Sequence, residues 1–455
     1  MKLIYNVSDK PKFGQLIAFA FQQLLAIMAA TIAVPMIVSG TYDCGEINMS
    51  TAAALFGAGV GTLVYVLFTL KKSPVFLGSS FAFLGSMSAA FAGAASAQAG
   101  FAGLIIGAIF AGLVYVVIAI VVKIAGVKWI NKLMPAVVIG PTVSIIGLSL
   151  AGNAVGDLKT APAGGSVYVA LICGLVTLVV TMLCSTYGKK MARLIPFIIG
   201  ILAGYAVALV FTLIGMSTDN SALLVLNFDT FKALTADGVT LKTFLSVPDF
   251  TFLEAVKGIK EIDASYIGSL AAAYVPVAFV VFAEHIADHK NISSIIEKDL
   301  LEDPGLSRTL LGDGIGSMFG ALFGGCPNTT YGESVGCVAI TRNASVVTII
   351  ATAVCAIIVS FISPFVAFLS SIPNCVMGGV CIALYGFIAV SGLKMVQGVD
   401  LGKNRNLFVV SVILITGIGG LAISFGKVTI TSVACALILG ILTNIILSGK
   451  NADAE

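Results

Sequence analysis

Residues 327–342 read Pro-Asn-Thr-Thr-Tyr-Gly-Glu-Ser-Val-Gly-Cys-Val-Ala-Ile-Thr-Arg and lie between apolar runs. The stretch opens with a proline, two hydroxyl side chains and an aromatic ring, and a glycine then precedes the carboxylate of Glu333. Non-helical backbone at membrane depth persists only where protein or a water-filled cavity satisfies its polar groups, and a carboxylate there is costly and usually functional. The stretch therefore predicts a polar ligand site inside a bilayer, which is typical of a transporter.

The composition of the whole chain agrees with a membrane location. Of its 455 residues, 58% are hydrophobic and only 10% are charged, against roughly 25% charged in soluble domains. The apolar runs are long rather than alternating, which favours an all-α polytopic membrane protein over a barrel. The nine cysteines show no CxxC or metal-ligand spacing, so reduced thiols and no metal site are expected. No Walker, HExxH or Ser-His-Asp pattern occurs, so we expect neither ATP drive nor an enzyme.

The apolar runs divide the chain into fourteen predicted transmembrane segments. They cover approximately 13–39, 51–70, 74–93, 102–123, 134–153, 166–187, 194–215, 267–290, 307–325, 327–341, 345–368, 373–393, 405–425 and 427–448. Segments three and ten are interrupted by Gly78-Ser79-Ser80 and Thr329-Thr330-Tyr331-Gly332. Their first halves are expected to be short extended strands and their second halves helices.

The positive charges support this count. With the N-terminus inside, most of the 25 Lys and Arg residues fall in cytoplasmic loops, as the positive-inside rule requires. We therefore expect a multi-pass membrane protein with both termini cytoplasmic. The long segment 216–266 becomes an extracytoplasmic loop, with a short helix near Phe252–Ile259.

Two motifs recur at similar places in the two halves of the chain. Segments three and ten each carry a proline, two hydroxyl residues and an aromatic residue, at 74–81 and 327–331. Later in each half come the runs 135–140 and 373–378, each beginning with proline and ending with glycine. Seven segments per half would make the second half enter the membrane from the opposite side. The fold is thus predicted to be a 7+7 inverted repeat, in which paired interrupted segments mark a binding site near the midplane.

Acidic residues supply the candidate chemistry. Glu284 and Asp288 are four residues apart in segment eight, so they share a helix face. Glu284 follows an apolar run, whereas Asp288 and His289 lie nearer the cytoplasmic end, where His285, Asp288 and His289 could equally be a helix rim that reaches water. A carboxyl group buried in an apolar medium takes up a proton more easily than in water, so such groups can couple transport to a proton gradient.

The ligand is predicted from the groups that surround these carboxylates. Glu333 lies where a helix is expected to begin, and it either caps that helix or accepts hydrogen bonds from a ligand. Together, Glu284 and Glu333 suit a flat, neutral ligand with N–H donors and C=O acceptors, and backbone amides near Gly332 supply donors. Phe81 and Tyr331, from the two interrupted segments, are placed to stack on or pack around a ring.

Several runs of sequence resemble one family. They are Phe282-Ala-Glu-His-Ile, Asp303-Pro-Gly-Leu, Pro327-Asn-Thr-Thr-Tyr-Gly-Glu, Ala339-Ile-Thr-Arg342 and Pro373 to Tyr385. Over nearly the whole chain the sequence resembles the nucleobase–ascorbate transporter (nucleobase:cation symporter-2) family, in its bacterial uracil permease branch. The resemblance implies a core domain (13–123 and 267–368), a gate domain (134–215 and 373–448) and proton symport, often in a homodimer.

The resemblance also implies roles for individual residues. Uracil would bind between the strands of segments three and ten, with its N–H groups on Glu284 and Glu333. Phe81, Tyr331 and Gly332 would line the ring, and Tyr385 would approach from the gate domain. Glu284, Asp288 and Glu333 are the expected proton-coupling residues. No other cofactor and no nucleic-acid partner is expected; the lipid bilayer and the substrate are the partners.

Three positions depart from the family pattern. Ser334 stands where the family usually has asparagine, and Gln22-Gln23 stand where it often has Gln-His. Asp288 stands where uracil permeases often have a histidine implicated in coupling, with His289 next to it. Our hypothesis is that Asp288 replaces that histidine as a titrating group.

Two alternatives to a uracil carrier stay open. One is a carrier of another nucleobase, such as xanthine or thymine. The other is an anion transporter or channel of the same architecture, although two carboxylates and no lysine or arginine at the predicted site would repel an anion.

Overall fold

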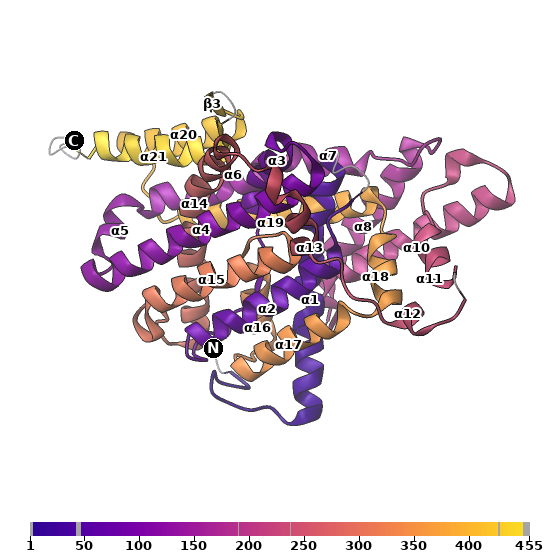
Figure 1. Ribbon diagram of the computed structural model, residues 1–455. Helices are drawn as coiled ribbons and strands as arrows, with labels where there is room; N and C mark the ends of the chain where they lie inside the picture. Colours follow the sequence, from indigo (N-terminus) through magenta and orange to yellow (C-terminus); the bar gives the residue numbers. More distant parts are fainter. Residues whose placement is uncertain (1–2, 42–46, 190, 237, 426–427, 449–455) are drawn as a thin grey trace.

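The computed structural model describes residues 3–41, 47–189, 191–236, 238–425 and 428–448 (Figure 1). Within these ranges the chain is mostly helical. The longer helices are α1 (Phe13–Thr41), α2 (Thr51–Phe68), α4 (Ala97–Ala125), α6 (Ala136–Ser149), α8 (Val167–Tyr187), α10 (Pro196–Ser217), α14 (Ala264–Ile296), α15 (Leu306–Gly324), α17 (Val346–Val359), α19 (Asn374–Val396), α20 (Asn404–Ile418) and α21 (Ser432–Ile446).

Shorter elements connect these helices. The short helices are α3 (Leu84–Gly93), α5 (Lys128–Leu133), α7 (Ala151–Leu158), α9 (Met191–Leu194), α11 (Asp229–Thr235), α12 (Leu241–Phe244), α13 (Thr251–Gly258), α16 (Gly332–Thr341) and α18 (Ser363–Ser370). The strands are β1 (Leu77–Ser79), β2 (Asn328–Thr330), β3 (Ile423–Phe425) and β4 (Val428–Ile430). The helix predicted near Phe252–Ile259 is confirmed as α13.

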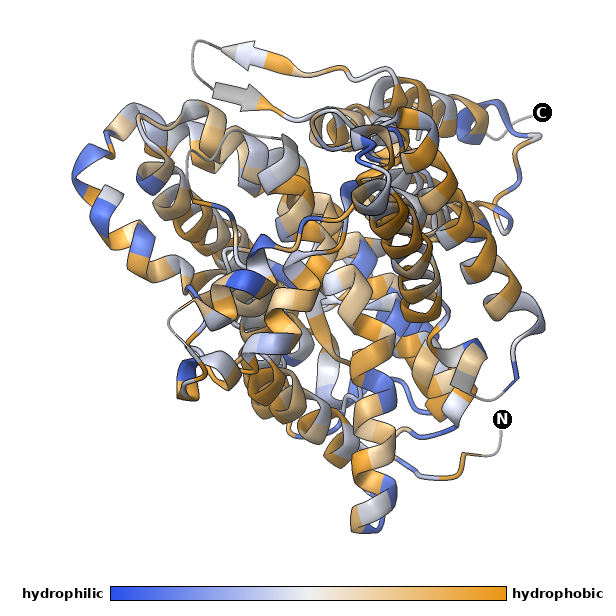
Figure 2. Cartoon of the chain, turned by 90° about the vertical axis from the view of Figure 1, so that its right-hand side faces the viewer, coloured by the Kyte–Doolittle hydropathy of each residue, from blue (hydrophilic) through white to orange (hydrophobic). Residues whose placement is uncertain are grey.

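The helices carry the apolar residues that a bilayer requires. In the described part of the chain, eight helices are long and apolar enough to cross a membrane by length and composition, and four further apolar helices are shorter. Hydrophobic residues predominate along the helices and hydrophilic ones gather in connecting segments (Figure 2). Each of the fourteen predicted segments contains helix, but in the described part of the chain only eight helices are both long and apolar enough to span, so the count of fourteen spans stays a prediction.

Strands β1 and β2 lie in the third and tenth predicted segments, as expected, and they pair with each other. The pairing is antiparallel, with Leu77 opposite Thr330 and Ser79 opposite Asn328. Neighbouring helices satisfy further polar groups of the pair: Asn328 Nδ2 donates to the carbonyl oxygen of Gly57 (3.2 Å), and Thr62 Oγ1 accepts from the backbone N–H of Leu77 (2.9 Å). These bonds are what make extended backbone stable among apolar helices.

Glycines allow α2 and α15 to pack with their backbones in contact. A Cβ atom placed on Gly57 would lie 2.5 Å from the carbonyl oxygen of Gly320, and one on Gly61 would lie 2.7 Å from that of Gly316. Small residues that let helices approach closely are the usual device of membrane helix packing. Helix α15 packs against both α2 and α4 (Figure 1), and α2 and α15 also contact the strand pair.

Replacing Gly57 by alanine is expected to destabilise the protein. Alanine normally favours a helix over glycine by about 0.5–1 kcal/mol, but overpacking costs roughly 1–3 kcal/mol, so the clash decides the sign. Gly268→Ala in α14 is the matched control, because no atom lies within 4 Å of its new Cβ. Thermal unfolding followed by size-exclusion chromatography should show a lower melting temperature for Gly57→Ala alone. Equal melting temperatures would contradict the close packing.

A second group of helices packs in a similar way. Helices α6 and α19 follow Pro135 and Pro373, the two prolines of the repeated motif, and lie against each other. Ser144 Oγ on α6 donates to the carbonyl oxygen of Ala389 on α19 (3.0 Å). Elements from matching places in the two halves therefore touch three times, as α2 with α15, β1 with β2, and α6 with α19. These contacts support the inverted repeat and the core and gate domains, which stay proposals.

Candidate functional site

A cavity of about 320 Å³ lies beside the paired strands. Its walls come from the β1–α3 segment, from β2 and α16, from α14, and from α6, α10 and α19 on the other side. It is therefore lined by elements of both predicted domains. Five predicted substrate-site residues and Asp288 line it: Phe81, Glu284, Asp288, Tyr331, Gly332 and Glu333.

Helix α14 carries two of the three carboxyl groups into this cavity. Glu284 is half-buried and Asp288 is buried, one helical turn apart on the same face, as their spacing predicts. Thr330 Oγ1 on β2 donates a hydrogen bond to Asp288 Oδ2 (2.9 Å). Glu333 lines the same cavity as these two side chains. Like charges repel, so ionising all three carboxyl groups at once would be unfavourable.

The third carboxyl group lies at the start of α16. This helix begins at Gly332 directly after Tyr331, so Glu333 is in its first turn. Gly332 is exposed to the cavity, and helix starts carry free backbone N–H groups and a partial positive charge. The site therefore places hydrogen-bond acceptors on carboxylates beside donors on backbone amides.

Of the three predicted aromatic site residues, two line the cavity and one does not. Phe81 is on the cavity wall, and its ring meets that of Tyr385 edge to face, with centroids 5.5 Å apart. Tyr385 is itself buried behind Phe81 and is not among the described residues that line the cavity. Tyr331 lines the cavity, but its hydroxyl donates to the carbonyl oxygen of Ser79 (2.7 Å) and its ring packs on Gly78. Phe81 is thus the ring best placed to contact a flat ligand.

The two histidines do not face the cavity. The interpretation of His289 as a water-exposed helix rim is wrong, because α14 continues to Ile296 and His289 is fully buried. His285 is also fully buried, and its Nδ1 lies 2.7 Å from Asp313 Oδ2 on α15. Of the two neighbours Asp288 and His289, only Asp288 reaches the cavity.

Two departures from the family pattern contact each other. Gln23 Nε2 on α1 donates to Ser334 Oγ (2.7 Å), and the same oxygen accepts from the backbone N–H of Phe76 (3.0 Å). Both side chains are buried. Ser334 therefore joins α16 to α1 and to the segment before β1, and it is not among the described residues that line the cavity.

Sequence reasoning missed four other polar residues that line the cavity. These are Ser185, Arg193, Asn291 and Ser391. Asn291 is three residues after Asp288, so the helical spacing could have revealed it. Arg193 could not be found in that way, because it belongs to the four-residue helix α9 and reaches the cavity only through the tertiary fold.

A second, smaller cavity of about 160 Å³ lies on the other side of Phe81. It is lined by residues of the short 3₁₀ helix η1 (Phe81–Phe83), of α3 and α6, and of the start of α21, among them Ser149 and Thr431. Phe81 lines both cavities, so its ring stands between them.

The fold and this site together define a membrane transport protein, and the chain belongs to the permease family, whose sequence pattern matches residues 14–425. It is similar to three bacterial proteins named uracil permease. That of Bacillus caldolyticus is 38% identical over all of this chain and 97% of its own length. The protein of Bacillus subtilis (strain 168) is 36% identical over 100% and 98%. The protein of Escherichia coli (strain K12) is 33% identical over 96% and 92%.

Solved structures resemble the chain in fold alone. The transmembrane domain of the cyanobacterial bicarbonate transporter BicA matches with a TM-score of 0.59 and 16% identity, over 97% of this chain and 99% of that domain. The murine anion transporter Slc26a9 in its inward-facing state matches with a TM-score of 0.62 and 12% identity, over 97% and 69%. The chain is thus a multi-pass membrane protein with a fold that anion transporters also use.

Proposed function

We propose that this protein carries uracil across the cytoplasmic membrane of a bacterium together with protons. The observation that carries the proposal is the cavity in which Glu284, Asp288 and Glu333 meet the start of α16. Uracil is flat, offers two N–H donors and two carbonyl acceptors, and has no charge. Carboxylates on α14 and α16 would accept from the N–H groups, backbone amides near Gly332 would donate to a carbonyl, and Phe81 would cover the ring.

The same carboxyl groups would carry the coupling protons. Because their charges repel one another, a neutral ligand that hydrogen-bonds to one of them changes how readily the others hold protons. Asp288 takes the position of the family histidine and faces the cavity, which supports our hypothesis that it is the second titrating group. Proton and substrate would then be bound in one cavity and released together.

We further propose that the described conformation is open to the cytoplasm. The exposed residues that line the cavity include Arg193, four residues after Lys189, and Asn291, directly after Lys290. The positive-inside rule puts these basic residues in the cytoplasm. The smaller cavity behind Phe81 would then belong to the outward route. Movement of the core helices against the gate helices would expose the carboxylates to each side in turn. Cytoplasmic termini and a homodimer are part of the same proposal.

The site argues against anion transport, although the fold is shared with anion transporters. Three carboxyl groups line the cavity, and the one basic residue among its described lining side chains is the exposed Arg193. An anion bound beside β1 and β2 would lie next to negative charge, without a counter-ion.

Uptake of labelled uracil into proteoliposomes, with and without an inward proton gradient, tests the proposal. We expect accumulation above equilibrium that a protonophore abolishes and that xanthine does not compete. Uracil exchange without accumulation would contradict proton coupling but support uracil as the substrate. Flux of bicarbonate or sulfate without uracil flux would overturn the substrate and favour the anion alternative.

A native cysteine offers a test of where the cavity opens. Cys337 is one turn after Glu333 on α16 and lines the cavity. A small, membrane-impermeant thiol reagent applied from the cytoplasmic side should block uracil uptake, and uracil should slow the block. The Cys337→Ser variant should be resistant. Block from the opposite side alone would contradict the proposed orientation.

A further inference from the structure

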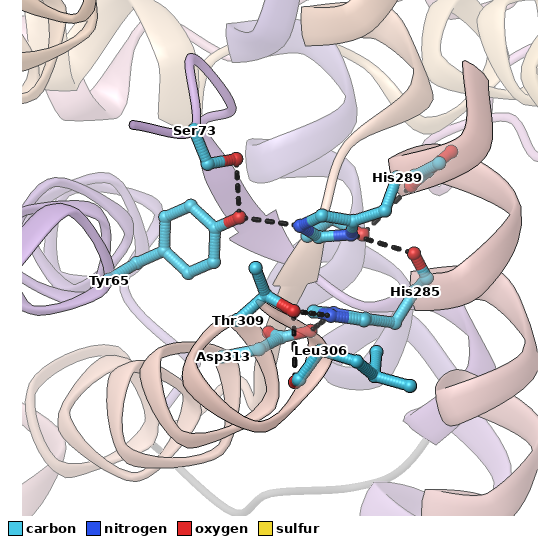
Figure 3. Close-up of polar contacts among 9 residues, drawn as sticks. Tyr65, Ser73, His285, His289, Leu306, Thr309 and Asp313 are labelled. Carbon is cyan, nitrogen blue, oxygen red and sulfur yellow. Dashed lines mark hydrogen bonds and ion pairs between the residues drawn. The ribbon is translucent and has the colours of Figure 1, made fainter. Parts of the chain in front are cut away.

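A second group of polar side chains lies inside the helices, away from the cavity (Figure 3). The hydroxyl of Tyr65 on α2 lies 2.7 Å from His289 Nε2 on α14 and 2.7 Å from Ser73 Oγ, just before β1. His289 Nδ1 lies 2.8 Å from the carbonyl oxygen of His285. Tyr65, Ser73 and both histidines are fully buried, and the two imidazole rings stack with centroids 4.0 Å apart.

The chemistry of the partners fixes the direction of these hydrogen bonds. A backbone carbonyl only accepts, so His289 Nδ1 donates to it. In the neutral imidazole Nε2 is then an acceptor, so Tyr65 donates to His289 and Ser73 donates to Tyr65. With a neutral His289, each of these three hydrogen bonds has one donor and one acceptor. A charged one would be buried beside a tyrosine and a carbonyl, without a carboxylate in contact among the described residues.

This chain of hydrogen bonds joins two walls of the cavity. Ser73 opens the segment that leads into β1, and His289 directly follows Asp288 on α14. Asp288 also receives a direct hydrogen bond from β2, where Thr330 donates to its carboxylate. Asp288 is thus held by β2 through its own side chain and by α2 and the β1 segment through its neighbour.

We propose that Tyr65 and His289 are positioning residues for Asp288. The Ser73–Tyr65–His289 chain fixes how α14 is rotated against α2, and so fixes where Asp288 points. His289 itself carries no proton during transport. The inference rests on the proposed function, because it assigns Asp288 to coupling.

Two tyrosine variants test the proposal. Tyr65→Phe removes both hydroxyl contacts. Tyr115→Phe is the matched control, because Tyr115 is also buried, packs edge-on against His285, and its hydroxyl has no hydrogen-bond partner among the described residues. For Tyr65→Phe we expect uracil binding to purified protein within about two-fold of wild type, and gradient-driven uptake roughly 2- to 30-fold slower. Tyr115→Phe should match wild type in both. Equal effects of the two substitutions would overturn the proposal.

Two histidine variants separate positioning from proton transfer. Glutamine at 289 can donate to the His285 carbonyl and accept from Tyr65, whereas leucine can do neither. His289→Gln should keep most of the gradient-driven uptake and His289→Leu should lose it. If both variants lose it equally while still binding uracil, His289 carries the proton and the proposal is wrong.

Hydrogen–deuterium exchange tests the Ser73–Tyr65–His289 hydrogen bonds without any substrate. Amides of α14 around residues 284–296 should exchange faster in Tyr65→Phe than in Tyr115→Phe. Unchanged exchange would refute the positioning role even if uracil transport is established. Faster exchange in Tyr65→Phe, together with no uracil flux in the wild-type protein, would support the structural role of Tyr65 and contradict the proposed function.

Discussion

Replacing Glu284 by glutamine is expected to weaken uracil binding roughly 10- to 100-fold. The glutamine has nearly the same shape, but its amide lacks the charge, and a hydrogen bond to a charged group contributes about 1.5–3 kcal/mol. The amide also presents N–H groups where the ligand presents its own. Equilibrium binding of labelled uracil to the purified protein measures the effect.

A surface glutamate provides the control for this substitution. Glu302 is exposed in the connection between α14 and α15 and does not line the cavity. Glu302→Gln should leave the dissociation constant unchanged. If Glu284→Gln also leaves it unchanged, the carboxylate on α14 does not contact the ligand, and the binding site must be sought elsewhere in the cavity.

Replacing Asp288 by asparagine is expected to separate binding from coupling. The asparagine oxygen can still accept the hydrogen bond from Thr330, so the local geometry is kept while the proton-binding group is lost. Uracil binding should stay within a few-fold of wild type. Accumulation driven by an inward proton gradient should fall to equilibrium, measured as the final internal uracil concentration in proteoliposomes.

The exposed Asp249 serves as the control for Asp288. Asp249→Asn, in the long loop between α10 and α14, should accumulate uracil like wild type. Unchanged accumulation in Asp288→Asn would refute a coupling role for this residue. The coupling proton would then be assigned to Glu284 or Glu333.

Local chemistry in the sequence was enough to predict the strand segments and the acidic helix face. Hydroxyl and glycine residues interrupt segments three and ten, and β1 and β2 form there. The four-residue spacing of Glu284 and Asp288 put both side chains on one face, and both line the cavity. These predictions held because each depends on residues within a single turn or strand.

Contacts between distant segments could not be predicted from spacing alone. No local pattern shows that Tyr65 on α2 contacts His289, so a helix rim that reaches water stayed open as an interpretation of a side chain that is fully buried. The approach of Arg193 to the cavity depends on how α9 packs after α8, which no local pattern encodes. The place of Tyr385 was expected only through family resemblance, and the structure puts it behind Phe81 rather than on the cavity wall.

The pairing of β1 with β2 also bears on how the protein is made. Leu77 leaves the ribosome long before its partner Thr330, and at about 5–20 residues per second the delay is tens of seconds. During that time the first strand has no partner for its backbone, and α2 lacks the glycine face of α15. The N-terminal half must therefore remain incompletely folded in the membrane until β2 and α15 have been made. A nascent chain that stops before residue 328 cannot complete the ligand site.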